Sequence, residues 1–292
     1  QESDAAENQA LWKWLRKELL QEEINESSII YIDLDNRKYK SIKTASALEK
    51  IIDDLSITNG LKYLFIDEIQ NVDGFEEVIN AYRSEGDYSI FITGSNSYLL
   101  SGELVTKLIG RYIEFEIYPL SFDEYLDMKK YYSKNINPNL LVELNEYIVN
   151  DGFPRSLLMD DDNAKSIYTK GIIDEIFSKD IKRRVKIRDV EGFEIVRNFV
   201  MNNFGSTMNV NSIQKSLEKN NIRISRETIK RYLTILIDAK IIYPCDRFDI
   251  KSKKSISGEK KYYLADLSFY YILNTNKRIN YGPCLENIVY IF

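Results

Sequence analysis

Two neighbouring acids follow a short apolar run in the first third of the chain. Asp67 and Glu68 come directly after Leu64-Phe65-Ile66, a run typical of a strand buried on both faces of a parallel sheet. Open α/β sheets bind ligands at the carboxyl ends of their strands. Asp67 could hold the shell of a Mg²⁺ ion there, and Glu68 could polarise a water molecule that attacks a phosphate. The alternative is an acidic strand end that binds no ligand.

A second buried run also ends in polar residues. Ser89-Ile90-Phe91-Ile92-Thr93 leads into Gly94-Ser95-Asn96-Ser97. On a strand beside the two acids, a polar side chain at this end would reach the γ-phosphate or the attacking water. Asn96 is the first choice for such a sensor, and Thr93 and Ser95 are the next.

Other features limit the chemistry that the chain can perform. None of the 292 residues is histidine, which excludes Ser-His triads, histidine bases and His-ligated zinc. Arg111 follows Gly110 and could contact a phosphate as an arginine finger; the alternative is a structural salt bridge. Two cysteines, Cys245 and Cys284, make no disulfide framework and indicate a reducing cytoplasm. No apolar run approaches the ~20 residues that span a bilayer, so we expect no membrane partner.

Strands and helices alternate over residues 1–119. We expect helices at Leu11–Glu23, Thr44–Leu55, Phe75–Tyr82 and Glu103–Ile109, and strands at Ile29–Ile32, Tyr63–Ile66, Tyr88–Thr93 and Tyr112–Ile117. Alternation of this kind predicts a parallel, three-layer α/β sheet. The acids and the polar sensor residues would then meet at one edge of that sheet.

The pattern changes after Pro119. Helical periodicity covers Ser121–Tyr132, Asn139–Val149, Lys165–Lys182 and Gly192–Asn203. Ser121 with Glu124 three residues later predicts a capping box at the first of these helices. We therefore expect a helical region over residues 120–188.

Residues 189–264 have the order of a winged helix. We expect a short helix at Val210–Leu217, followed by a turn and a second helix at Arg226–Lys240 that is capped by Ser225. Strands at Ile241–Phe248 and Lys261–Leu264 then flank the basic loop Lys251–Lys260. Helix, turn, helix and hairpin is winged-helix organisation. Between Lys165 and Lys261, 22 Lys and Arg residues oppose 12 Asp and Glu residues, although the whole chain has a net charge of -5. This part could face a polyanion; the alternative is a set of solvated helix faces.

Together these motifs resemble a prokaryotic AAA+ ATPase family with the pattern LDEIQ, TGSNS, L-x-GR and PLSF-x-E. The segments FIDEIQ and FITGSNS carry the first two motifs, Leu108–Arg111 the third and Pro119–Glu124 the fourth, and Phe75 occupies the family's aromatic position. Gly152-Phe153-Pro154 resembles its GG-F-P motif, and Lys261–Asp266 and Gly282–Tyr290 resemble the start of its C-terminal region.

The resemblance implies a P-loop domain of the AAA+ type over residues 1–119, a helical lid over 120–188 and a winged-helix-like domain over 189–264. Residues 265–292 would begin a C-terminal domain with a nuclease-type fold, whose first acid would be Glu286. ATP and Mg²⁺ are the implied cofactors. Asp67 would bind Mg²⁺, Glu68 would activate water, and Arg111 could serve as the finger.

The Walker A motif GxxxxGK[ST] does not occur in this sequence. In the AAA+ strand order, the Walker A strand lies beside the sensor strand, which would otherwise be a bare apolar edge. We expect that segment to precede these residues. The alternative is a remnant that no longer binds nucleotide.

The expected function is that of an AAA+ ATPase whose ATP hydrolysis drives a conformational change, acting on double-stranded DNA if the basic segment contacts phosphate. The residues that would do so are Arg226, Lys230, Arg231, Lys251, Lys253 and Lys254. As a structural lid, the same segment would only pack against the ATPase core. The alternative function is a nucleic-acid-binding winged-helix protein with a vestigial, nucleotide-free core. A homo-oligomer is compatible with either function.

Overall fold

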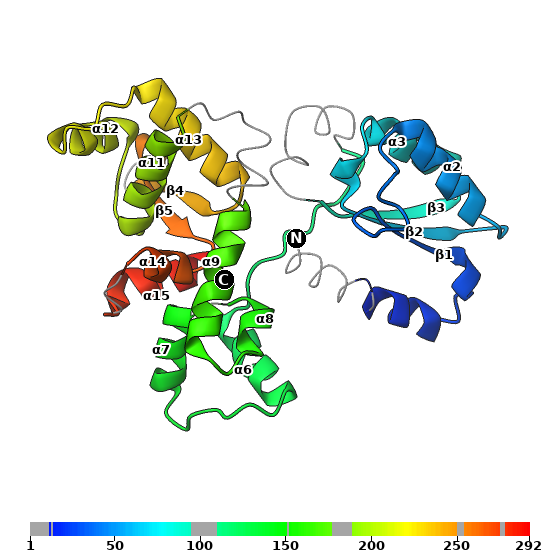
Figure 1. Cartoon of the computed structure of the whole chain (residues 1–292), viewed down its shortest axis with the longest axis horizontal. Helices are drawn as coiled ribbons and strands as arrows, with labels where there is room; N and C mark the ends of the chain where they lie inside the picture. The colour runs from blue at the N-terminus through cyan, green and yellow to red at the C-terminus, as the bar shows by residue number, and fades with distance from the viewer. Residues whose placement is uncertain are drawn as a thin grey trace. The chain divides into compact units, whose positions relative to one another are not determined.

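The computed structural model describes residues 12, 14–94, 110–150, 152–176, 189–249, 254–274 and 278–292. The chain divides into two compact units, Gln1–Phe115 and Glu116–Phe292 (Figure 1). The helix expected at Glu103–Ile109 lies outside the described residues. In the part of the chain that is described, no helix is long and apolar enough to cross a membrane.

The first unit is built on a parallel sheet of three strands in the order β1–β2–β3 (Figure 1). These are β1 (Ile29–Asp33), β2 (Lys62–Asp67) and β3 (Tyr88–Ile92), connected by α2 (Ala45–Leu55) and α3 (Phe75–Glu85). The pairing register places Asp33 beside Asp67 and Ile66 beside Ile92. The expected parallel α/β sheet is confirmed, and each of its three strands lies within one residue of its predicted bounds.

Helices cover both faces of this sheet. Ile66 and the other inward residues of β1 and β2 pack in one core with the apolar faces of α2 and α3. On the opposite face, the rings of Phe65 and Phe91 stack 4.7 Å apart, and Trp12 packs edge-on against Phe65 at 5.1 Å. Residues 14–21 are helical and lie on that second side in Figure 1. The first unit therefore has three layers.

The second unit is mainly helical. Its described helices are α6 (Phe122–Tyr131), α7 (Leu140–Asn150), α8 (Pro154–Leu157), α9 (Asp162–Glu175), α11 (Val190–Asn202), α12 (Val210–Lys219), α13 (Arg226–Asp238), α14 (Ser268–Leu273) and α15 (Tyr281–Ile291). The capping box at α6 is confirmed, because Ser121 Oγ accepts from the Glu124 N–H at 3.3 Å and Glu124 Oε2 accepts from the Ser121 N–H at 2.8 Å. The expected helix Lys165–Lys182 is described only as far as Ile176.

An antiparallel hairpin of β4 (Ile242–Asp249) and β5 (Lys254–Leu264) follows α13. The prediction of a loop over Lys251–Lys260 is wrong from Lys254 onward, because β5 already begins there. Its early residues pair with the end of β4 across a register shift at Asp246 and Arg247. A shift of this kind accommodates extra residues without ending the hairpin.

The strand expected at Tyr112–Ile117 is also wrong: residues 112–118 form no strand. Alternating apolar and acidic residues suit a strand, but an isolated strand leaves its backbone groups without partners. Among the described residues, none pairs with this segment as a strand. Instead, Glu116 accepts hydrogen bonds from Lys240 Nζ at 2.7 Å and from the Tyr243 hydroxyl at 2.6 Å.

One hydrophobic core extends through the second unit. It includes Tyr125 of α6, Tyr147 of α7, Phe193 of α11, Leu236 of α13 and Tyr271 of α14. The divisions near residues 189 and 265 therefore stay predictions, since side chains from both sides of each are buried together.

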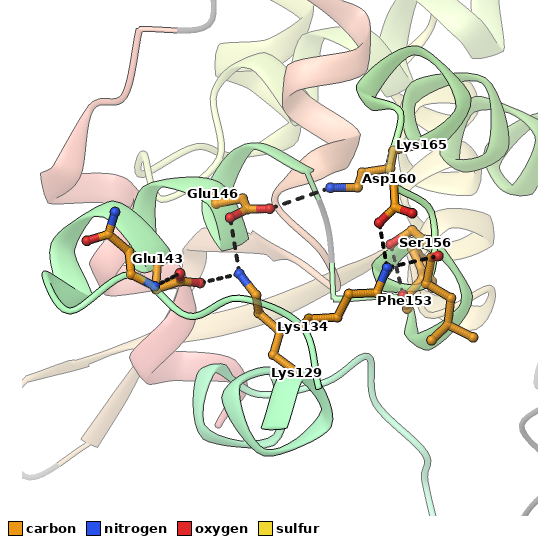
Figure 2. Close-up of polar contacts among 10 residues, drawn as sticks. Lys129, Lys134, Glu143, Glu146, Phe153, Ser156, Asp160 and Lys165 are labelled. Atoms are coloured by element: carbon orange, nitrogen blue, oxygen red, sulfur yellow. Dashed lines mark hydrogen bonds and ion pairs between the residues drawn. The ribbon is translucent and has the colours of Figure 1, made fainter. Parts of the chain in front are cut away.

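A buried ion pair joins α6 to α7 in this unit (Figure 2). Lys129 Nζ lies 2.6 Å from Glu143 Oε2, and the two side chains are only 8% and 3% exposed. The same ammonium group lies 3.3 Å from Glu146 Oε2, whose other oxygen is 3.5 Å from Lys165 Nζ of α9. Alternating charges therefore connect three helices in one network.

Candidate functional site

Three of the predicted residues meet at the carboxyl edge of the parallel sheet. Asp67 ends β2, Glu68 follows it, and Thr93 comes directly after β3. The Thr93 hydroxyl donates a hydrogen bond to Asp67 Oδ1 and accepts one from the Glu68 N–H at 3.3 Å. Asp67 and Glu68 are only 1% and 5% exposed. Parallel strand pairing thus brings the two acids and one of the sensor candidates together.

The electrostatic environment of Asp67 disfavours its charged form. Burial raises the pKa of this carboxyl, and the nearby charges of Asp33 and Asp35 raise it further. Hydrogen bonds from Thr93 and Tyr31 act in the opposite direction; the Tyr31 hydroxyl donates to Asp67 Oδ2 at 3.3 Å. A bound cation would offset the cost of burying the carboxylate charge.

Glu68 has an unusual backbone conformation. Its φ of 58° and ψ of 42° lie in the left-handed region, which costs a non-glycine residue about 1–2 kcal/mol. A single 3₁₀ turn, η2 (Ile69–Asn71), follows it. Within this turn, Gln70 donates a hydrogen bond from Nε2 to Glu68 Oε2. Strained residues of this kind cluster at functional sites, where the surrounding structure holds them in place.

The donor set fits Mg²⁺ that is held largely by phosphate. Mg²⁺ is commonly bound through one or two carboxylates together with substrate phosphates and water. The Asp67 carboxylate and the Thr93 hydroxyl supply hard oxygen donors at the strand ends. In the described part of the chain, no group of three or more Cys, Asp or Glu side chains could hold a metal ion by itself. The cation would therefore depend on the phosphates for most of its ligands.

The other residues predicted for this site stay predictions. Ser95 and Asn96 lie outside the described residues, so their contact with phosphate stays a prediction. Arg111 is described and its side chain is exposed. An exposed position suits both readings of Arg111, the phosphate contact and the surface salt bridge.

The residues predicted to contact DNA are described only in part. Arg226, Lys230 and Arg231 of α13 are exposed, and Arg226 Nε donates a hydrogen bond to Gln214 Oε1 of α12 at 3.0 Å. Lys251 and Lys253 lie outside the described residues, and Lys254 is described only as the first backbone position of β5.

Acidic partners neutralise several of the basic residues along the hairpin. Lys260 Nζ lies 2.8 Å from Asp246 Oδ1, and Arg247 Nη1 lies 3.3 Å from Glu259 Oε2. Lys261 pairs with Glu286 of α15, and the Tyr263 hydroxyl donates to the same Glu286 oxygen at 2.6 Å. These contacts lower the pKa of Glu286, the Lys261 hydrogen bond most of all. They attach α15 to β5 and favour a structural role for the charges of the hairpin.

Sequence reasoning missed three residues at the sheet edge, namely Tyr31, Asp33 and Gln70. Asp33 could have been found, because it follows Ile32 at the end of a buried strand as Asp67 follows Ile66. The contact between Tyr31 and Asp67 depends on the pairing register of β1 and β2, which the sequence does not state.

Comparisons with known proteins cover both parts of the chain. A family model described as an AAA domain matches residues 14–126, which include the Asp67 site. A model of a domain of unknown function (DUF8612) matches residues 141–278. The Walker-type ATPase PABY2304 of Pyrococcus abyssi has a similar structure, with a TM-score of 0.50 and 17% identity over 78% of this chain and 66% of that one. At this identity the likeness shows a similar fold and no more.

Two curated proteins are similar over most of the chain. The uncharacterized protein MJ1544 of Methanocaldococcus jannaschii is 38% identical over 90% of this chain, which spans only 59% of that protein. An uncharacterized protein of Haemophilus influenzae is 35% identical over 277 residues, which are 94% of this chain and 68% of the relative. The chain therefore belongs to the same family as the Haemophilus influenzae protein, and its residues 14–126 match the AAA domain.

Proposed function

We propose that the protein binds and hydrolyses ATP with Mg²⁺ at the carboxyl edge of its parallel sheet, and that hydrolysis drives a conformational change. One observation carries this proposal: Asp67, Glu68 and Thr93 are buried together at the strand ends and joined through the Thr93 hydroxyl. Phosphoryl transfer depends mainly on positioning and on electrostatic stabilisation, for which such a fixed set of oxygen donors is suited.

Each residue has a separate part in this mechanism. Asp67 would hold the ligand shell of Mg²⁺, which when bound neutralises charge on the phosphates. Glu68 would accept the proton of the attacking water, and burial keeps its carboxylate from being fully hydrated. Thr93 fixes the distance between the two acids, because its one hydroxyl contacts the Asp67 side chain and the Glu68 backbone.

The decisive experiment measures ATP binding and turnover by the full-length gene product. Glu68→Gln should lower kcat by about 100-fold or more, since loss of a general base costs at least that much, while ATP binding is retained. Asp67→Asn should abolish the Mg²⁺-dependent step. Glu85→Gln makes the same chemical change at the exposed end of α3 and should leave turnover unchanged. Unchanged turnover in Glu68→Gln would show that the role given to Glu68 is wrong.

We also propose the division of the chain into an ATPase core, a helical lid over residues 120–188, a winged-helix domain over 189–264 and the start of a further domain. The succession α12, turn, α13 and the β4–β5 hairpin supports the winged-helix assignment. Movement of the lid and the winged helix with nucleotide would couple hydrolysis to a client. A homo-oligomer would let Arg111 act on a neighbouring subunit's nucleotide.

A second candidate function is contact with double-stranded DNA through α13, favoured by the three exposed cations Arg226, Lys230 and Arg231. Reversing all three charges should weaken binding at low salt and lower the slope of log K against log salt by up to about 3. Reversing the exposed charges of Arg37, Lys38 and Lys40 is the matched control. Binding to duplex DNA that is absent, or independent of salt, would exclude this function. If the full-length protein binds DNA but no ATP, the vestigial-core alternative holds.

A further inference from the structure

The turn after Glu68 places a second polar side chain against the proposed catalytic base. Gln70 is the middle residue of η2, and its Nε2 donates a hydrogen bond to Glu68 Oε2. Glu68 is 5% exposed, so this amide replaces much of the hydration that its carboxylate would have in water. Enzymes commonly orient a catalytic base by a hydrogen bond from a further side chain, and Gln70 is in the position to do so for Glu68.

The backbone on both sides of Gln70 is fixed. The Ile69 N–H donates to the Thr93 carbonyl oxygen at 3.0 Å, and the Asn71 N–H donates to the Glu68 carbonyl oxygen at 2.9 Å. The Ile69 side chain is fully buried in the core of the first unit. Because the backbone is hydrogen-bonded on both sides of Gln70, the Cα of Gln70 is fixed close to Glu68.

The other end of the same amide is an acceptor without a protein partner. Gln70 Oε1 is buried, and no hydrogen-bond donor contacts it within the described part of the chain. Buried polar atoms without a partner are rare and indicate a bound water or a catalytic role. A glutamine side chain that orients the attacking water is a known device in nucleotide hydrolysis.

We propose that Gln70 is a positioning residue for ATP hydrolysis. Its Nε2 holds the Glu68 carboxylate, and its Oε1 accepts a hydrogen bond from the water that Glu68 activates. The water oxygen forms a bond to the γ-phosphorus, its proton passes to Glu68, and the bond from phosphorus to the bridging oxygen breaks, so that ADP leaves with the electron pair. Gln70 itself gains and loses no proton. This inference rests on the proposed ATPase function.

The test compares variants of one turn in the full-length protein. Gln70→Met keeps the length of the side chain and removes both of its hydrogen-bonding groups. It should lower kcat by about 10-fold or more, a part of what a general base contributes, with KM for ATP and the melting temperature nearly unchanged. Asn71→Ala is the matched control, because it removes the 2.9 Å hydrogen bond from Asn71 Nδ2 to Asp35 Oδ1 in the same turn. It should leave kcat within about twofold of wild type.

Two further variants keep the test decisive. Gln70→Glu retains the shape of the side chain and replaces the donating amide by a carboxylate, so it should lower kcat at least as much even if Gln70→Met folds poorly. Combining Gln70→Met with Glu68→Gln should lower kcat by much less than the product of the two single losses, because both side chains act on the same water molecule.

The failure of this inference differs from the failure of the proposed function. If Glu68→Gln abolishes turnover but Gln70→Met and Gln70→Glu keep full kcat, only the role of Gln70 is overturned. An equal loss in Asn71→Ala, or additive losses in the double variant, would overturn it as well. If Glu68→Gln leaves turnover unchanged, the catalytic role proposed for Glu68 is wrong, whatever the Gln70 variants show.

Discussion

The buried pair between Lys129 and Glu143 allows a sharp test of how the second unit is stabilised (Figure 2). At the 2.6 Å separation of Lys129 Nζ from Glu143 Oε2, two unit charges attract by about 6 kcal/mol at an effective dielectric constant of 20. Desolvation of both charges offsets most of this attraction. The pair therefore adds little net stability, although breaking it is costly.

Lys129→Met should destabilise the second unit by about 3–5 kcal/mol, since it leaves a carboxylate buried without a cation. Glu143 would keep the hydrogen bond from the Asn137 N–H, which does not neutralise its charge. Glu146 is affected less, because its side chain is 36% exposed and it still lies near Lys165. At roughly 2–4 °C per kcal/mol for a unit of this size, the melting temperature should fall by about 10 °C.

Thermal unfolding of the full chain, followed by calorimetry, measures this effect. Lys130→Met is the matched control: Lys130 is the next residue of α6 and pairs with Asp127 at 2.8 Å, but the two side chains are 65% and 74% exposed. The control should change stability by less than about 1 kcal/mol. Adding Glu143→Gln to Lys129→Met should recover much of the loss, because it removes the unpaired charge. If Lys129→Met and Lys130→Met lower the melting temperature equally, the reasoning from burial is refuted.

Two further predictions concern the buried contacts of Asp266. Gly152→Ala should destabilise the second unit by about 1–3 kcal/mol in thermal unfolding, because a Cβ there would lie 2.8 Å from the Leu120 carbonyl oxygen; Gly171→Ala, where nothing lies within 4 Å, should not destabilise it. Burial raises the pKa of Asp266 above its ordinary 3.8, despite hydrogen bonds from Ser268 and Gly152, so its contribution to stability is complete below that value and is lost as pH rises through the raised value. The stability advantage of wild type over Asp266→Asn should therefore shrink as pH rises above about 4, and melting temperatures over a pH series that show it growing would contradict the assignment.

Local signals account for the parts of the fold that the sequence predicted well. The helix at Thr44–Leu55 combines an apolar stripe with a capping residue, and in the structure the Thr44 side chain accepts a hydrogen bond from the Ala47 N–H. Ser121 and Glu124 work in the same way at α6. These signals depend on residues three or four positions apart, so one sequence is enough to read them.

The site was predictable where it depends on strand ends and not where it depends on turn geometry. Asp67 and Thr93 meet because parallel strands end at the same edge of a sheet, a rule that needs only the two strand assignments. Gln70 lies against Glu68 because Glu68 adopts the left-handed conformation and the chain then makes a 3₁₀ turn. Glutamate rarely adopts the left-handed conformation, so the residue type at position 68 does not predict this turn.

The segment Tyr112–Ile117 shows why alternation alone does not make a strand. Its apolar and acidic residues alternate as regularly as a half-buried strand requires, yet alternation describes only how side chains would divide between two faces. Strand formation also needs a neighbouring backbone to pair its N–H and C=O groups, and that is a property of the tertiary structure. In the described structure Glu116 is instead engaged through its side chain by Lys240 and Tyr243.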